Sequence, residues 1–238
     1  NESLRKHAIQ NVQTCLNIEK ANGELFRSVK GLNCSGGAFL EDYASFIKAC
    51  IAVHEITFDP KWLSEAHRLT DLMLGKFWQD EEVIPYDAAL GDETLIVRPR
   101  SLFDNPIPCG SSQAASALLA LSRLLGIVKY YDIALGILTG IPKSLYAQPT
   151  SAGNFLSTYS SLIFPCVEIA VVGGDLGAIK SFQRVVGGKY IPNRALTGSI
   201  LGDSYELGVE IPLLKGRLED GGLTMAFLCE NYSCQLPT

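Results

Sequence analysis

The chain lacks the features that nucleic-acid and membrane partners require. It has no run of basic residues, and 25 acidic side chains outnumber 20 Lys and Arg, for a formal net charge of −5. Because phosphate binding needs a cluster of Lys and Arg, we expect no nucleic-acid partner. No stretch of about 20 uninterrupted apolar residues occurs, so we expect no membrane span.

The seven cysteines lack the spacing of a disulfide framework, since they are scattered and odd in number. We therefore expect reduced thiols, no disulfide and a cytoplasmic location. Cys229 and Cys234 are separated by ENYS, which is not the C-x-x-C of a redox pair. Two thiols alone are also a poor zinc site. The sequence thus predicts no bound metal and favours a structural role for Cys229 and Cys234.

Two common catalytic and cofactor motifs are absent. The nucleophile elbow G-x-S-x-G does not occur. The run VVGGDL follows an apolar segment but lacks G-x-G-x-x-G, and its acidic residue would repel a phosphate. We therefore expect no dinucleotide or other cofactor.

The chain also has no initiator Met and no signal-peptide pattern, and it opens on residues that already read as helix. We expect a fragment of a longer chain. Hydrophobic residues make up 47% of it and charged residues 19%, which favours a packed core over disorder.

Two kinds of helical segment alternate along the first two thirds of the chain. Segments of one kind carry a single apolar stripe, typical of a helix covered on one side: residues 3–20, 59–78 and 129–147, the last kinked or broken at Pro142. Segments of the other kind are apolar on nearly every side, typical of a buried helix: residues 40–57, 111–126 and 151–164. An inner ring of helices covered by an outer ring produces this alternation. We therefore predict a mainly α chain, with hairpins of a partial α/α toroid over residues 1–165.

The end of the chain has a different pattern. VEIAVVGG reads as a buried strand, DLGAIKSFQRVVGG as a helix, and RALTGSI and TMAFLCE as further strands. We predict a small α/β appendage over residues 166–238. Another short strand is predicted at residues 94–98, within an otherwise loop-like segment.

Six stretches together resemble a known family: GAFLEDYASFI, TFDPKWLSEAHRL, FWQDEE, VRPRSLFDNPIPCGSS, KYIPNRALT and TMAFLCENYSCQLP. In that order they resemble the C-terminal part of the spermatogenesis-associated protein 20-like family, thioredoxin-domain-containing proteins of unknown function. The resemblance covers essentially the whole chain, and LEDYA and CENYSCQLP are its most specific parts. It implies a thioredoxin-like domain and first toroid hairpins that this chain lacks. It also implies a six-hairpin toroid similar to those of sugar epimerases and six-hairpin glycosidases.

Glu41 and Asp42 fall in the first turn of the predicted buried helix at residues 40–57. The resemblance implies that such helix starts open toward a substrate cleft, where carboxylates act as acid and base or hold sugar hydroxyls. Successive helical residues point about 100° apart, so the two are not expected to converge. Capping of the helix is the alternative for both.

Four further residues are candidates for substrate binding. Ser111, Ser112 and Gln113 open the next buried helix and are expected on the same rim as Glu41 and Asp42; an ordinary serine cap is the alternative. Arg98, like Arg100, could bind a carboxylate or phosphate, or form a surface salt bridge.

His54 follows Cys50 by one helical turn, as a metal pair would. Without further ligands, we expect a hydrogen-bonded core histidine.

Two functions follow from these observations, and the sequence leaves open whether the chain is an enzyme. One is a fragment of a carbohydrate-active toroid, of the sugar isomerase, epimerase or glycosidase type, with a small carbohydrate ligand. The other is a non-catalytic binding or scaffold module that accompanies a thioredoxin-like domain. A second carboxylate, or a histidine, facing Glu41 or Asp42 across a cleft would discriminate between them.

Overall fold

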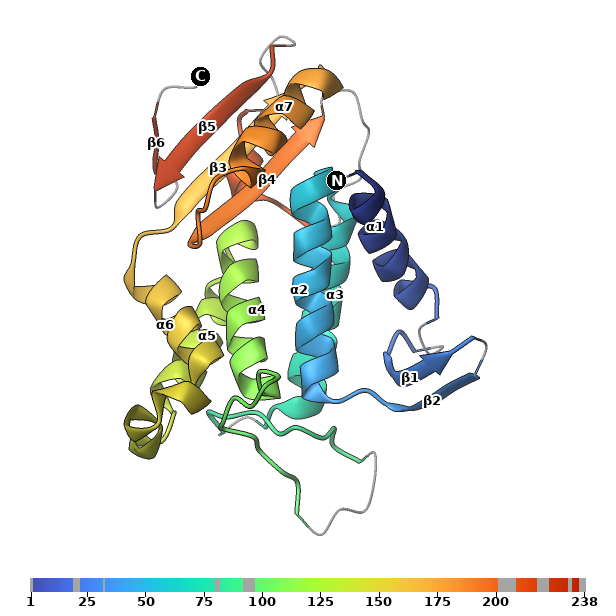
Figure 1. Cartoon of the computed structure of the whole chain (residues 1–238), viewed down its shortest axis with the longest axis vertical. Helices are drawn as coiled ribbons and strands as arrows, with labels where there is room; N and C mark the ends of the chain where they lie inside the picture. Colours follow the sequence, from blue (N-terminus) through green and yellow to red (C-terminus); the bar gives the residue numbers. More distant parts are fainter. Residues whose placement is uncertain are drawn as a thin grey trace.

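The structure is a computed structural model that describes residues 2–18, 22–31, 33–79, 82–91, 97–200, 209–217, 223–230 and 233–235. These residues form seven α-helices and two small sheets, so the chain is mainly α with a smaller β part (Figure 1). Residues 94–96 of the strand predicted at 94–98 lie outside the described residues.

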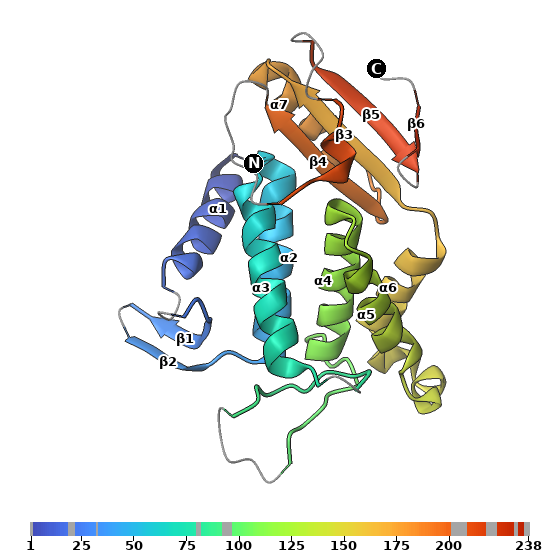
Figure 2. The same cartoon turned by 180° about the vertical axis from the view of Figure 1, so that it is seen from behind.

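Helical hairpins form the larger part of the molecule. Helix α2 (Leu40–Thr57) pairs with α3 (Lys61–Phe77), and α4 (Gly110–Leu125) pairs with α5 (Val128–Thr139). Helix α4 also contacts α2 on one side and α6 (Gly153–Ile163) on the other, so α2, α4 and α6 form a row (Figures 1 and 2). Helices α2 and α4 are buried on most sides and α3 along one stripe, as predicted.

Helices α6 and α1 are less buried than the sequence predicted. Helix α6 buries only Phe155 and Thr158, so the prediction of a helix buried all round is wrong. In α1 (Glu2–Leu16) only Val12 is buried, and Leu4 is 67% exposed. The reason is position: α6 packs on α4 and α1 on α2, and no other described helix covers the far face of either.

Helix ends follow the local sequence. Gly126 follows α4 as its C-cap and adopts a left-handed conformation with φ 67°. Phe58 follows α2 in the same conformation, with φ 58°, although Phe58 has a side chain. Helix α5 ends at Thr139, before Pro142, and confirms the predicted break.

A four-stranded sheet lies at one end of the helices, in the order β4-β3-β5-β6 (Figure 1). Strands β3 (Val167–Gly173) and β4 (Arg194–Ile200) are parallel, and α7 (Leu176–Gly187) connects them. Strand β5 (Met225–Glu230) runs antiparallel to β3, and the short β6 (Ser233–Cys234) runs antiparallel to β5. The predicted strands and helix of the small α/β unit are confirmed.

The core crosses from the helices into the sheet. Ala170 and Val172 of β3 belong to the same buried cluster as the helical hairpins. Ile169 and Val171, on the opposite face, pack with Ile179 of α7 and with Phe58. A division at residue 165 therefore runs through a continuous core, and two separate domains stay a prediction.

One hairpin was not predicted at all. Strands β1 (Phe26–Lys30) and β2 (Asn33–Gly37) are antiparallel and mostly exposed. Neither strand has an alternating apolar pattern, which is the signal that sequence reasoning uses.

Candidate functional site

The starts of α2 and α4 lie side by side, as predicted. A Cβ atom added to Gly110 would lie 3.0 Å from the side chain of Leu40 and 3.2 Å from the backbone nitrogen of Glu41. A side chain at position 110 would therefore force its neighbours to shift, and glycine permits the close approach. Groups from the first turns of both helices can therefore meet at one rim.

A cleft of about 390 Å³ opens at this rim. Its polar side chains include two carboxylates and a hydroxyl: Glu41, Asp87 and Ser101. Its walls are largely apolar: Phe39, Ala88, Pro99, Phe103, Ile107 and Pro108. A mostly apolar concave site with a few polar groups is the usual form of a small-molecule pocket.

Glu41 and Asp42 take different positions in the first turn of α2. The Asp42 carboxylate accepts a hydrogen bond of 2.8 Å from the backbone N–H of Phe39, which caps the helix. Glu41 instead lines the cleft. Arg27 of β1 donates to both carboxylates, at 2.8 Å to Glu41. The two alternatives for this pair thus divide between the residues: Asp42 caps the helix, and Glu41 reaches the cleft.

Asp87 is the second carboxylate of the cleft. Its carbonyl accepts from Leu40 N–H at 3.0 Å and its N–H donates to Pro99 O at 2.9 Å, which fixes it at the start of α2. Burial raises the pKa of Asp87, a 2.7 Å hydrogen bond from Ser101 opposes that rise, and the negative charge of Glu41 adds to it. Asp87 therefore holds a proton to higher pH than an ordinary aspartate does.

Sequence reasoning missed Asp87. It lies in a loop without helical or strand periodicity, and its sequence signal is a single charge within the apolar run IPYDAAL. Arg27, which pairs with Glu41, was missed because it belongs to the unpredicted β1 strand.

Ser111, Ser112 and Gln113 lie in the first turn of α4 but are buried and do not line the cleft. Gln113 donates to Pro108 O at 3.0 Å and accepts from Ser45 at 2.6 Å. Ser112 donates to Asp104 at 2.6 Å. The substrate-binding role of these three residues stays a prediction.

Asp104 holds the starts of two helices together. Its buried carboxylate accepts from Cys109 N–H at 3.0 Å and from Ser112, at the start of α4. It also accepts from the backbone N–H groups of Asn154, at 2.8 Å, and Phe155, in the first turn of α6. Asp104 therefore caps the first turn of α6 and braces the start of α4, and no serine side chain caps α4.

Arg98 and Arg100 both stack on one aromatic ring, with guanidinium carbons 3.9 and 3.8 Å from the Tyr86 ring centre. Arg100 also pairs with Glu82 at 2.8 Å, which is the salt-bridge alternative. Arg98 donates to Ala88 O at 2.9 Å. Neither lines the cleft, so ligand binding by Arg98 stays a prediction.

His54 is a core histidine, as predicted. It is completely buried, and its ring nitrogens lie 3.1 Å from Asp59 O and 2.9 Å from the Thr197 hydroxyl. Burial lowers the pKa of His54 to about 4, so the ring is neutral at pH 7. Within the described ranges, no group of three or more His, Cys, Asp or Glu side chains could hold a metal ion.

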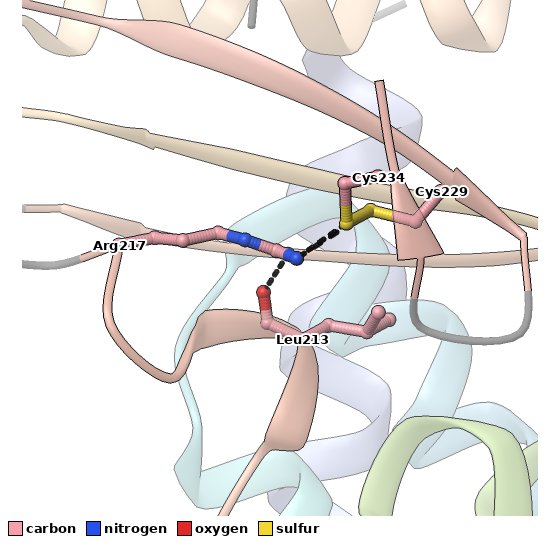
Figure 3. Close-up of a disulfide and its surroundings, with 4 residues drawn as sticks. All are labelled: Leu213, Arg217, Cys229 and Cys234. Atoms are coloured by element: carbon pink, nitrogen blue, oxygen red, sulfur yellow. Dashed lines mark hydrogen bonds between the residues drawn. A yellow bond between two sulfur atoms is a disulfide. The ribbon is translucent and has the colours of Figure 1, made fainter. Parts of the chain in front are cut away.

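The prediction of no disulfide is wrong. Cys229 of β5 and Cys234 of β6 are bonded to each other (Figure 3). They are directly paired residues of two antiparallel strands, so the register of the strands brings the two sulfurs together. Counting cysteines and searching for C-x-x-C could not reveal this register. The cytoplasmic location was inferred from reduced thiols and stays a prediction.

The fold and site define a class: a mainly α protein built of helical hairpins, with a small α/β unit and a carboxylate-lined cleft at the helix starts. No helix in the described part of the chain is long and apolar enough to span a bilayer. No family model matches the chain.

Similar curated proteins exist in three mammals. Spermatogenesis-associated protein 20 of Homo sapiens is 29% identical over 234 residues, which cover 92% of this chain and 29% of the relative. The proteins of the same name from Rattus norvegicus and Mus musculus are 27% and 26% identical, each over 204 residues and 84% of this chain. These matches confirm the resemblance to the spermatogenesis-associated protein 20-like family. The chain spans less than a third of the length of these relatives.

Proposed function

We propose that the cleft at the starts of α2 and α4 binds a carbohydrate, and that the chain is part of a carbohydrate-active protein of the glycosidase or sugar isomerase or epimerase type. One observation carries the proposal: Glu41 and Asp87 line the same cleft, where burial and, to a smaller extent, the charge of Glu41 raise the pKa of Asp87. A second carboxylate beside Glu41 is the feature that favours an enzyme over a scaffold module.

The chemistry of the walls fits a sugar. A sugar ring presents hydroxyl groups at its edge and apolar C–H groups on its faces. The carboxylates of Glu41 and Asp87 can accept from hydroxyls, while Phe39, Phe103 and Pro108 offer apolar surface to a ring face.

The two carboxylates are suited to different steps. Asp87, with its raised pKa, is the better general acid and would donate a proton to the oxygen of a leaving group. Glu41, ion-paired with Arg27, would act as the base or as the group that stabilises positive charge at the sugar carbon.

The helical hairpins support a toroid as the parent architecture. Buried α2 and α4 stand next to each other, each paired with the following helix. Apolar side chains are exposed at the end of the row, where further hairpins of a toroid would pack: Leu156, Tyr159, Ile163 and Phe164. The same exposed surface also favours the second candidate function, a non-catalytic scaffold module.

The test uses the complete protein and a panel of mono- and oligosaccharides, with affinity measured by calorimetry and turnover by product analysis. We expect at least one sugar to bind. Glu41→Gln or Asp87→Asn should weaken the affinity for that sugar about 10-fold, or about 1.4 kcal/mol. Asp132→Asn, on the exposed face of α5, is the matched control and should change nothing. Binding without turnover would favour the scaffold function, and no binding by any sugar would refute the carbohydrate proposal.

A further inference from the structure

An arginine contacts the disulfide at the edge of the sheet (Figure 3). Nη2 of Arg217 donates to Sγ of Cys234 and lies 3.5 Å from Sγ of Cys229. The same guanidinium donates to the carbonyl of Leu213 and lies 4.9 Å from the centre of the Phe227 ring. These two contacts hold a positive charge beside both sulfur atoms.

The two half-cystines differ in accessibility. Cys229 lies on β5 and is only 5% exposed, whereas Cys234 lies on β6, the edge strand, and is exposed. A cleft of about 500 Å³ borders the bond and is lined by both residues. An incoming thiol can therefore approach from the cleft and from the side of Cys234.

We propose that Cys229–Cys234 is a thiol–disulfide exchange site that accepts two electrons from a dithiol reductant, with Arg217 stabilising the thiolates that leave. The class of substrate is a small dithiol, or a protein with a reactive pair of cysteines. This activity is independent of the carbohydrate cleft at the opposite end of α2.

The exchange balances in two steps. A thiolate of the dithiol attacks Sγ of Cys234, the bond to Cys229 breaks, and Cys229 leaves as a thiolate 3.5 Å from Arg217. The second thiolate of the reductant then attacks the reductant's first sulfur, which is bonded to Cys234 in the mixed disulfide. This step closes the disulfide of the reductant and releases Cys234 as a thiolate, also in contact with Arg217. Both cysteines take protons from water, and the dithiol leaves as a disulfide.

The surrounding charges determine how strongly Arg217 stabilises the leaving thiolates. A guanidinium beside a thiolate favours its formation, and a thiol that ionises readily is the better leaving group. Glu168 interacts with Arg217 and Glu230 lines the cleft, so these carboxylates reduce the influence of the arginine. Burial raises the pKa of Cys166, the free thiol in the same cleft, which makes it a weak competitor for the exchange.

The first test treats the complete, folded protein with dithiothreitol and counts alkylated Cys229 and Cys234 by mass spectrometry over time. We expect reduction without unfolding. Arg217→Gln should slow it about 3- to 10-fold, because the leaving thiolate loses its cation. Arg217→Lys keeps the charge and should retain most of the rate, and Arg184→Gln, on exposed α7, should match the wild type. A bond that is reduced only when the protein unfolds, or an unchanged rate in Arg217→Gln, would overturn the proposal.

A second measurement needs no variant. In the reduced wild-type protein at pH 7, Cys234 should react with iodoacetamide faster than Cys15, an exposed free thiol in the same chain. Equal or slower reaction of Cys234 would show that Arg217 does not activate the thiolate, and the proposal would fail even if the Arg217→Gln protein did not fold.

Discussion

The two ends of α2 carry titratable side chains in opposite settings. At its start, Glu41 lines a cleft together with Asp87, whose pKa is raised by burial and by the charge of Glu41. Near its end, His54 is completely buried between Asp59 O and Thr197, and burial lowers its pKa to about 4. Burial is the larger cause at both ends. A shifted pKa therefore marks a candidate site only where the group also lines a cleft.

The largest expected effect lies at the sheet end of α2, where Gly198 of β4 leaves room for Phe58. A Cβ at position 198 would lie 2.4 Å from the Phe58 ring and 2.5 Å from the backbone oxygen of Val171. Because backbone cannot move aside as a flexible side chain can, we expect Gly198→Ala to lower the free energy of unfolding by about 3 kcal/mol.

Chemical denaturation would measure this change. Gly187→Ala, in exposed α7 with no atom within 4 Å of the added Cβ, is the control and should be neutral or slightly stabilising. Equal stability of the two alanine variants would mean that Phe58 does not pack on Gly198.

His54 should make the sheet end sensitive to acid. The ordinary pKa of 6.5 is lowered to about 4 in the folded chain, so the unfolded state binds more protons between these values. The free energy of unfolding therefore falls as pH falls from 6.5 toward 4, by up to about 3 kcal/mol from this residue. Chemical denaturation of the wild type and of His54→Gln near pH 6.5 and near pH 4 would measure this change in the free energy of unfolding. A fall of the same size in both proteins would assign the effect to other groups.

A smaller effect should separate the adjacent carboxylates at the cleft end. Asp42→Ala removes the cap of α2 and should cost about 1 kcal/mol. Glu41→Gln removes a partly exposed ion pair with Arg27 and should change stability by less than about 0.5 kcal/mol. Thermal melts of the two variants make the comparison, and a larger loss for Glu41→Gln would reverse the roles of the two carboxylates.

Sequence periodicity predicted the helices and strands whose burial is set by the pattern of apolar residues within one segment. The α2–α3 and α4–α5 hairpins and the β3–α7–β4 unit were predicted because an apolar stripe, or its absence, reports burial within one segment. The burial of α6 was predicted wrongly because the apolar residues of a segment do not show whether another element packs against them.

The candidate site was predicted only in part, for the same reason. Glu41 at a cleft was implied by the family resemblance, together with its predicted place in the first turn of a buried helix. Asp87 and Asp104 lie in loops, where no periodicity applies, and their roles depend on partners far along the chain. The disulfide depended on the register of a hairpin that composition does not report.

The pKa of the Asp87 carboxyl tests the pairing of Glu41 with Asp87 most directly. Carbon-13 NMR titration would measure this pKa in the wild type and in Glu41→Gln. We expect a wild-type pKa above the ordinary 3.8 of aspartate. In Glu41→Gln the pKa of Asp87 should be lower than in the wild type but still above 3.8, because burial is the larger cause of the shift. An Asp87 pKa at or below the ordinary value, unchanged by Glu41→Gln, would contradict a shared carboxylate site.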